Sequence, residues 1–285
     1  MQSQTRGKMP ERSIGTVSKT VVPLRVPRVR IPVFPHIEGH EQPLLVTLFF
    51  YMMNKYDEIL QSFLTLADAS QAQILSRFFK TGKGEYGEGD KFLGIKVPVT
   101  RQIAKSYKKG MDFGTIKRLI YCEYHEVRLC GFLLLVEMMK KQSREVVDFY
   151  LQHACQANNW DLVDLSCIQI LGTWLTTRAD RDILYRLAES TNLWEQRIAI
   201  VSTLALIRCD EFDDTLRIAA KLLSHPHDLI HKAIGWMLRE VGKRDLYVLR
   251  EFLAQNYAQL HRTTLRYAIE RMDETERREW LTRGR

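Results

Sequence analysis

The feature that most constrains this chain is a series of amphipathic helical segments that recurs from Asn54 to the end. Segments of about 10–17 residues carry apolar residues at helical spacing and alternate with short polar or Gly/Pro breaks. No alternating strand pattern competes with them. Successive helix pairs recur at about 35–40 residues, a period typical of HEAT-like repeats, in which each pair buries its apolar faces by stacking on its neighbours. The sequence therefore predicts an all-α fold, an α-solenoid of HEAT-like helical repeats with a concave face.

The pattern also predicts where each helix lies. Helices are expected near residues 56–67, 70–80, 98–109, 113–121, 125–141, 144–156, 160–176, 180–190, 193–208, 212–223, 227–241, 244–257, 261–271 and 274–282. Because these segments fill the chain almost without interruption, we expect one repeat domain over residues 54–285.

The first 53 residues differ in composition from the rest. Residues 1–43 contain six of the eight prolines and no helical periodicity, which predicts a disordered basic arm. The apolar run that follows, Leu44 to Met53, is too short to span a bilayer, which takes about 20 residues. Two interpretations remain open: a genuine arm with a short apolar segment, or a start at Met52 or Met53.

The positive charge is spread too evenly to identify a partner. The net charge is +8, of which residues 1–53 carry +4 and the remaining 232 residues the other +4. Only a clustered basic surface would indicate nucleic-acid binding. The five cysteines occur singly in apolar helical stretches, without a C-x-x-C pair, and are predicted to be buried thiols of a protein in a reducing compartment.

Two motifs suggest ligand sites that their context disfavours. Residues 82–87 match the dinucleotide pattern G-x-G-x-x-G, but the match follows a helix and is surrounded by acidic residues, so we interpret it as a loop whose glycines supply positive φ angles. His225, His227 and His231 lack further ligands at metal spacing, and polarity at a helix start explains them better. We expect no metal and no cofactor.

The helix beginning at Trp160 is the first that carries chemistry. Trp160 and Asp164 are four residues apart and therefore lie on one face of the helix. A carboxylate on a largely apolar helix is costly to bury without a partner. The residues alone leave two explanations open: a capping or inter-helix hydrogen bond, or a site for a cationic ligand.

Basic side chains mark the helices that follow. Arg197 lies among apolar residues and requires a carboxylate or a phosphate. The helix at 227–241 has one apolar and one basic face, the latter holding Lys232, Trp236, Arg239 and Lys243. Arg262 and Arg266 extend the basic face by one helix pair. The spacings from Trp160 to Arg197 and from Arg197 to Trp236, 37 and 39 residues, predict equivalent places in successive repeats.

Four segments together resemble the AlkD-type DNA alkylation repair glycosylases. They are FLGIKVP (92–98), NNWDLVD (158–164), LWEQRIAI (193–200) and KAIGWMLREVGK (232–243), in the order and spacing of that family. The resemblance covers roughly residues 57–272. It implies HEAT-like repeats whose concave face binds duplex DNA, and excision of cationic alkylated purines such as N3-methyladenine and N7-methylguanine.

The resemblance also implies site residues. The family's catalytic aspartate corresponds to Asp164, its active-site tryptophans to Trp160 and Trp236, and its backbone-binding arginine to Arg197. A tyrosine that some members place near the lesion corresponds to Phe78, and the Gly-rich loop 82–90 is absent from shorter members. The expected DNA-binding residues are Lys232, Arg239, Lys243, Arg262, Arg266 and Phe78.

These inferences predict an enzyme of base excision repair, a monofunctional glycosylase that needs no cofactor. A cationic purine leaves without a strong general acid, so one carboxylate that stabilises the sugar cation and directs water suffices. We expect double-stranded DNA with alkylated purines as partner, no membrane, a monomer, and a cytoplasmic, nucleoid-associated location. The alternatives are a non-catalytic HEAT-like module that binds damaged or branched DNA, and a protein-binding scaffold.

Overall fold

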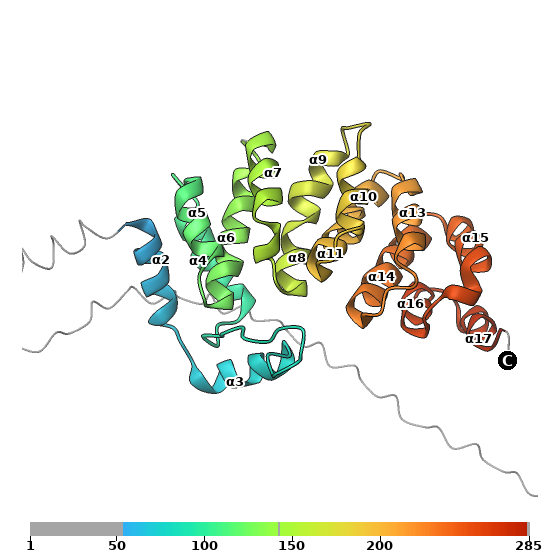
Figure 1. The fold of residues 1–285 in the computed structure, drawn as a ribbon, viewed down its shortest axis with the longest axis horizontal. Coiled ribbons are helices and arrows are strands. Elements are labelled where there is room, and N and C mark those ends of the chain that lie inside the picture. The colour runs from blue at the N-terminus through green and yellow to red at the C-terminus, as the bar shows by residue number, and fades with distance from the viewer. Residues whose placement is uncertain (1–53, 142, 284–285) are drawn as a thin grey trace, which may run out of the picture. The chain divides into compact units, whose positions relative to one another are not determined.

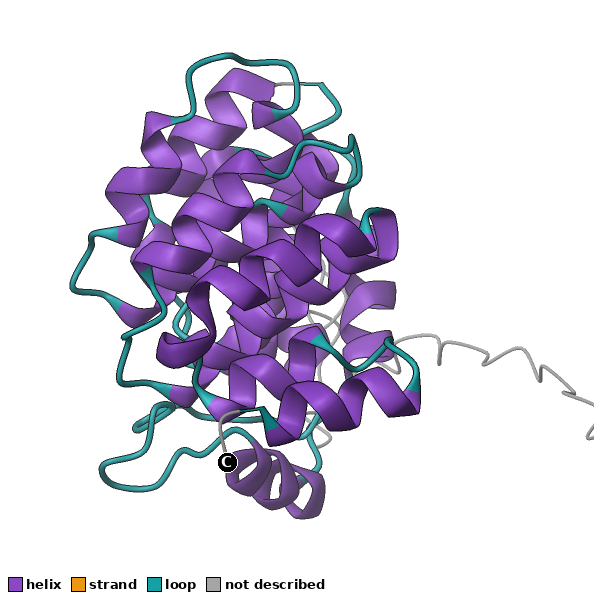
Figure 2. Cartoon of the chain, turned by 90° about the vertical axis from the view of Figure 1, so that its right-hand side faces the viewer, coloured by secondary structure: helices purple, strands orange, loops and turns teal. Residues whose placement is uncertain are grey.

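The computed structural model describes residues 54–141 and 143–283. The interpretations of residues 1–53 fall outside this part of the chain. Within it the secondary structure is helical (Figure 2). A single isolated bridge joins Lys91 and Tyr124. The predicted all-α class is confirmed.

The helices follow one another along the chain at short intervals (Figure 1). Their bounds are α2 Lys55–Leu64, α3 Ala69–Phe78, α4 Val97–Tyr107, α5 Phe113–Ile120, α6 His125–Met138, α7 Ser143–Gln152, α8 Trp160–Ser166, α9 Thr173–Leu175, α10 Asp182–Ala188, α11 Leu193–Ser202, α12 Leu204–Ile207, α13 Asp213–Lys221, α14 Asp228–Arg244, α15 Leu246–Asn256, α16 Arg262–Ala268 and α17 Glu274–Thr282. Short 3-10 turns lie at η1, Ala154–Gln156, and η3, Tyr257–Gln259, and η2, Ile168–Gly172, is a π-helical segment.

Most predicted helices are present, but two are interrupted. The segment expected at 160–176 is α8, η2 and α9, and the one expected at 193–208 divides at Thr203 into α11 and α12. The backbones of these interrupted helices approach closely, since a Cβ on Gly172 would lie 2.4 Å from the carbonyl oxygen of Ser202. Helical periodicity alone does not reveal such interruptions, because the apolar pattern continues through them.

The helices from α5 to α16 form two rows. The helices of the first row each contact the next, and we call them the inner row: α6, α8, α11, α14 and α16. The outer row precedes them in the chain as α5, α7, α10, α13 and α15, and most of its members pack on the inner helix that follows. This is the packing expected of an α-solenoid of helical repeats, and that prediction is confirmed (Figure 1).

The inner helices define the repeat length. They begin at His125, Trp160, Leu193, Asp228 and Arg262, which are 33 to 35 residues apart. The period is therefore slightly shorter than the predicted 35–40 residues. Residues can therefore be compared across the repeats by their position within each inner helix.

Not every cysteine is buried as predicted. Cys122, Cys130 and Cys167 lie in the core, whereas Cys155 and Cys209 are exposed, and all five are free thiols. Cys155 lies in the short turn η1, and Cys209 lies just after α12.

Candidate functional site

The site residues begin at the first turn of α8. Asn159 caps this helix, because its side-chain Oδ1 accepts a hydrogen bond from the Trp160 amide at 2.9 Å. Trp160 is half-buried, and its ring stacks on Phe79 with 5.3 Å between centroids. One turn later, Asp164 lies on the same face of the helix, as the spacing predicted.

Asp164 is paired with Arg197 of the neighbouring inner helix. The guanidinium Nε and Nη2 donate to the two carboxylate oxygens at 2.8 and 2.7 Å, and Nη1 donates to the carbonyl oxygen of Leu229 at 2.6 Å. Arg197 therefore connects three successive inner helices, α8, α11 and α14. The sequence left open whether each charge faces a protein partner or a ligand, and in the structure each has the other as its partner.

Burial decides the electrostatics of this pair. Removal from solvent raises the pKa of Asp164 above its ordinary value, and the Arg197 guanidinium opposes that rise. The Asp164 side chain is only 16% exposed and that of Arg197 only 6%. The pair is thus a nearly buried ion pair whose carboxylate is still reachable from one side.

Four of the inner helices, α8, α11, α14 and α16, each carry a charged residue at the same position of the helix. Counted from the first residue of each inner helix, Asp164, Arg197, Lys232 and Arg266 are all the fifth. This alignment was missed at the sequence level. The prediction that Trp160, Arg197 and Trp236 are equivalent is wrong: they are the first, fifth and ninth residues, because their spacings exceed the repeat length by one helical turn each time.

The residues on the basic face of α14 have different partners. Lys232 pairs with Asp228 at 2.8 Å, and Trp236 is half-buried one turn further on. Arg239 is paired with Glu270, which lies just after the end of α16. Of the predicted residues on this helix, Lys232 and Trp236 lie nearest the turn that touches Arg197.

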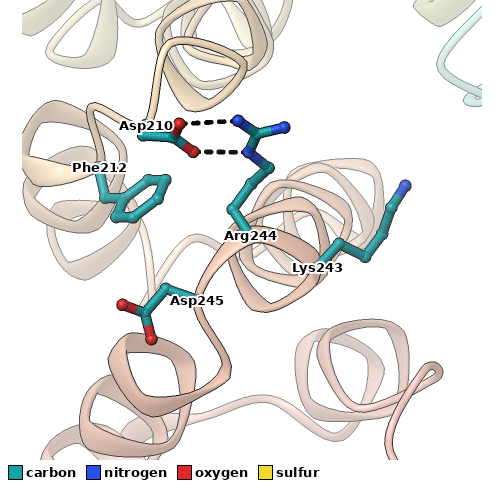
Figure 3. A pocket seen from close by; sticks show the side chains of 5 residues that line it. All are labelled: Asp210, Phe212, Lys243, Arg244 and Asp245. Carbon is teal, nitrogen blue, oxygen red and sulfur yellow. Dashed lines mark hydrogen bonds and ion pairs between the residues drawn. The ribbon is translucent and has the colours of Figure 1, made fainter.

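Lys243 lies at the opposite end of α14 from the Arg197 contact. It pairs with Glu240 and lines a surface pocket of about 450 Å³, which Asp210, Phe212, Arg244 and Asp245 complete (Figure 3). Arg244 crosses this pocket to bind both carboxylate oxygens of Asp210. The structure therefore separates Lys243 from Asp164 by most of the length of the helix.

The last two predicted basic residues lie on α16. Arg266 is exposed at the position equivalent to Lys232. Arg262 donates to the carbonyl oxygen of Leu281 at 2.9 Å, which holds it against the C-terminal helix. Arg266 thus continues the charged position of the inner row, whereas Arg262 has a structural partner.

Phe78, one of the expected DNA-binding residues, and its neighbour Phe79 both contact Trp160. Phe78 is 61% exposed and meets the Trp160 ring edge-on at 6.0 Å. Phe79 is buried and stacks on both Trp160 and Phe92, and Phe92 stacks in turn on His125 at 4.5 Å. A continuous series of rings therefore supports Trp160, and Phe78 is the most exposed phenylalanine of this group.

His125 connects the loop after α3 to the start of α8. Its Nδ1 lies 2.8 Å from Asp90, and its Nε2 lies 2.8 Å from Asp161. Burial of the ring disfavours the imidazolium, but the two carboxylates outweigh burial and raise the pKa of His125 to about 9. Asp161, in the first turn of α8, is therefore the partner of a buried cation next to Trp160.

This arrangement predicts a pH-dependent stability. Since the pKa of His125 is about 9 in the fold and 6.5 without it, the stabilisation is complete below pH 6.5 and is lost as the pH rises through 9. We expect the free energy of unfolding to fall by roughly 3 kcal/mol over this range. Urea titrations at several pH values measure the free energy of unfolding of the wild type and of His125→Gln. If this free energy depended on pH in the variant as it does in the wild type, the assignment to His125 would be contradicted.

The triplet His225, His227 and His231 performs structural tasks. His227 caps α14 by accepting from the Leu229 amide at 3.1 Å, and His225 contacts Gln196 at 2.8 Å. His231 stacks on His261. Over residues 54–141 and 143–283, no group of three His, Cys, Asp or Glu side chains is placed to hold a metal ion. In the same residues no helix is long and apolar enough to cross a membrane.

A family model described as DNA alkylation repair enzyme matches residues 59–272, and this range includes every site residue named above. The chain belongs to the DNA alkylation repair enzyme family. A solved structure described as a predicted DNA alkylation repair enzyme from Enterococcus faecalis resembles this family member with a TM-score of 0.61 and 19% identity. The match covers 73% of this chain and 97% of that one, and it supports the shared fold. No curated protein matches the sequence.

Proposed function

We propose that this repair-family chain is a monofunctional DNA glycosylase. It hydrolyses the N-glycosidic bond of cationic alkylated purines, such as N3-methyladenine and N7-methylguanine, in duplex DNA. The observation that carries the proposal is Asp164, a nearly buried carboxylate held in a fixed plane by Arg197 beside the half-buried Trp160. We expect it to act as a monomer, in the cytoplasm at the nucleoid, at the start of base excision repair.

The chemistry requires little more than this carboxylate. The alkylated purine is already cationic and leaves with the bonding electrons, so the sugar develops positive charge at C1′ as the bond breaks. Asp164 stabilises that charge and orients a water molecule for attack at C1′, and its two oxygens each retain a free lone pair after binding Arg197. Trp160 and Trp236 pack on the sugar and backbone and favour the cationic substrate.

Arg197 has two tasks in this proposal. Its contacts to Asp164 keep the carboxylate ionised in a buried place, and Nη1 and Nη2 each retain one N–H for a phosphate. Lys232 and Arg266, at the same position of the following repeats, continue the row along the DNA backbone. No lysine adjoins Asp164 in the described contacts, so the proposal includes no imine and no strand cleavage.

Release of methylated purine from alkylated duplex DNA tests the proposal. We expect Asp164→Asn to lower the single-turnover rate constant at least a hundredfold while duplex binding remains, because the amide cannot neutralise the sugar cation. The wild-type rate should also fall at acidic pH as Asp164 becomes protonated, and this dependence should vanish in the variant.

The bidentate pairing also favours a second candidate, a non-catalytic HEAT-like module that binds damaged or branched DNA. Both oxygens of Asp164 are engaged by Arg197, as in a purely structural ion pair. Wild-type protein that binds alkylated duplex without releasing base would establish this second function instead. Release that is equally fast in Asp164→Asn would retain the activity and exclude this residue as its carboxylate.

A further inference from the structure

The loop between α3 and α4 crosses the beginnings of four inner helices. Asp90 contacts His125, the first residue of α6, and Gly87 lies against Asn159, the cap of α8. Tyr86 extends further. Its ring lies edge-on to Trp194 of α11 at 6.1 Å and to His227, the cap of α14, at 6.2 Å. Figure 1 shows α3 and this loop lying beside the ends of the helices where α6 and α8 begin.

The loop is built to hold this position. Asp90 is almost fully buried and is paired with both His125 and Arg128. The Gly87 amide donates to the Lys80 carbonyl at 3.0 Å, and a Cβ on Gly87 would lie 2.5 Å from the carbonyl oxygen of Phe79. Glycine is therefore required next to Tyr86 because the backbone approaches too closely for any side chain.

Two acidic residues of the loop are engaged by the loop's own backbone. Glu85 accepts from the Gly82 amide at 2.9 Å, and Glu88 accepts from the Gly84 amide at 2.8 Å. Gly84 and Gly89 have positive φ angles, as the sequence predicted for this loop. The two carboxylates thus close the loop on itself. Glu85 and Asp161 still act electrostatically on Tyr86, so an anion at its hydroxyl requires the Lys232 ammonium as a counter-charge.

The surroundings of Tyr86 suit a hydrogen-bond donor for an anion. The ring is half-buried, and burial raises its pKa above the ordinary value of 10. The Trp160 indole and the Lys232 ammonium lower this pKa, whereas the Asp161 and Glu85 carboxylates raise it. The phenol therefore keeps its proton at neutral pH and can donate it. Trp160 and Lys232, which influence it, are both residues of the proposed DNA path.

We propose that Tyr86 is a DNA-binding residue whose hydroxyl, together with Lys232, holds a phosphate group of the strand that passes Asp164. This inference rests on the proposed function, which places the DNA strand beside Asp164. The Gly-rich loop then adds a contact that the repeats themselves do not supply, reaching from the N-terminal part of the domain to α14. The loop thereby places a neutral hydrogen-bond donor, the Tyr86 hydroxyl, beside a cationic one, the Lys232 ammonium.

Binding of a short, fluorescein-labelled, undamaged duplex tests the inference without any chemistry. We expect Tyr86→Phe to weaken binding about tenfold, the effect of one lost hydrogen bond to a charged group. The slope of log K against log salt should be unchanged, because no charge is removed, whereas Lys232→Gln should reduce that slope by about 0.9. Tyr247→Phe, at an exposed tyrosine of the outer row, is the matched control and should bind normally.

A second variant and a second readout separate the outcomes. Gly87→Ala should displace the loop and weaken binding at least as much as Tyr86→Phe. Base release by the wild type is the second readout, since it reports on the chemistry independently of the Tyr86 contact. Wild-type affinity in Tyr86→Phe would overturn the inference even if the protein is a glycosylase. Weakened binding without base release by the wild type would uphold the contact and refute the enzyme, and absence of duplex binding by the wild type would refute both.

Discussion

Arg197→Met is expected to destabilise the fold by about 3–5 kcal/mol, because it leaves Asp164 as a buried carboxylate without a partner. The substitution also removes the hydrogen bond to the Leu229 carbonyl, so the contacts between α8, α11 and α14 weaken together. Urea unfolding followed by circular dichroism gives the free energy directly. The pKa of Asp164 should rise further in this variant. The pH below which base release slows should therefore also rise.

The chain offers a matched control for this experiment. Arg266 is the fifth residue of its inner helix, as Arg197 is, but it is exposed. Arg266→Met should therefore change stability by less than about 1 kcal/mol. Equal losses in the two variants would show that the position in the repeat, rather than the buried pairing with Asp164, determines the cost.

Glu126→Ala is expected to cost about 4 kcal/mol or more. Its carboxylate is buried on α6 and accepts from the amides of Leu93, Gly94 and Ile95 at distances of 2.8 to 3.1 Å. Removing it leaves three buried N–H groups without acceptors, at roughly 1–3 kcal/mol each when water does not reach them. Chemical denaturation of the wild type and the variant measures the loss.

Glu126→Gln separates charge from hydrogen bonding at this position. The amide oxygen can still accept from Gly94 and Ile95, so we expect a smaller loss than for alanine. Hydrogen exchange at the three amides provides a local readout, and it should accelerate most in Glu126→Ala. Unchanged protection of all three amides in Glu126→Ala would contradict the role assigned to this carboxylate.

Glu126 explains the structure of a segment that the family resemblance had only identified. The segment FLGIKVP was among those that suggested the family, yet nothing in its own residues shows why three consecutive amides there are satisfied. Gly94 has φ +85° and packs so closely that a Cβ would lie 2.1 Å from the Asp68 carbonyl oxygen. The acceptor that completes this turn is more than 30 residues away, on the first turn of α6.

The sequence by itself determined the helical class, the repeat architecture and the face shared by Trp160 and Asp164. These follow from local periodicity, since residues four apart on a helix lie together whatever the surroundings. Residue type also indicated that Arg197 needs an anionic partner. The choice between a carboxylate and a phosphate requires knowledge of the neighbouring helix, which local pattern does not contain.

Only the tertiary structure decided which residues meet across repeats. The register of the inner row depends on where each helix begins, and those starts are set by caps and by loops that differ in length from repeat to repeat. A shift of one turn places Asp164 beside Arg197 and aligns both with Lys232 and Arg266, whereas raw spacing had aligned Trp160 with Arg197. Tyr86 reaches α14 for the same reason: long-range packing, rather than sequence distance, places the loop across the helices.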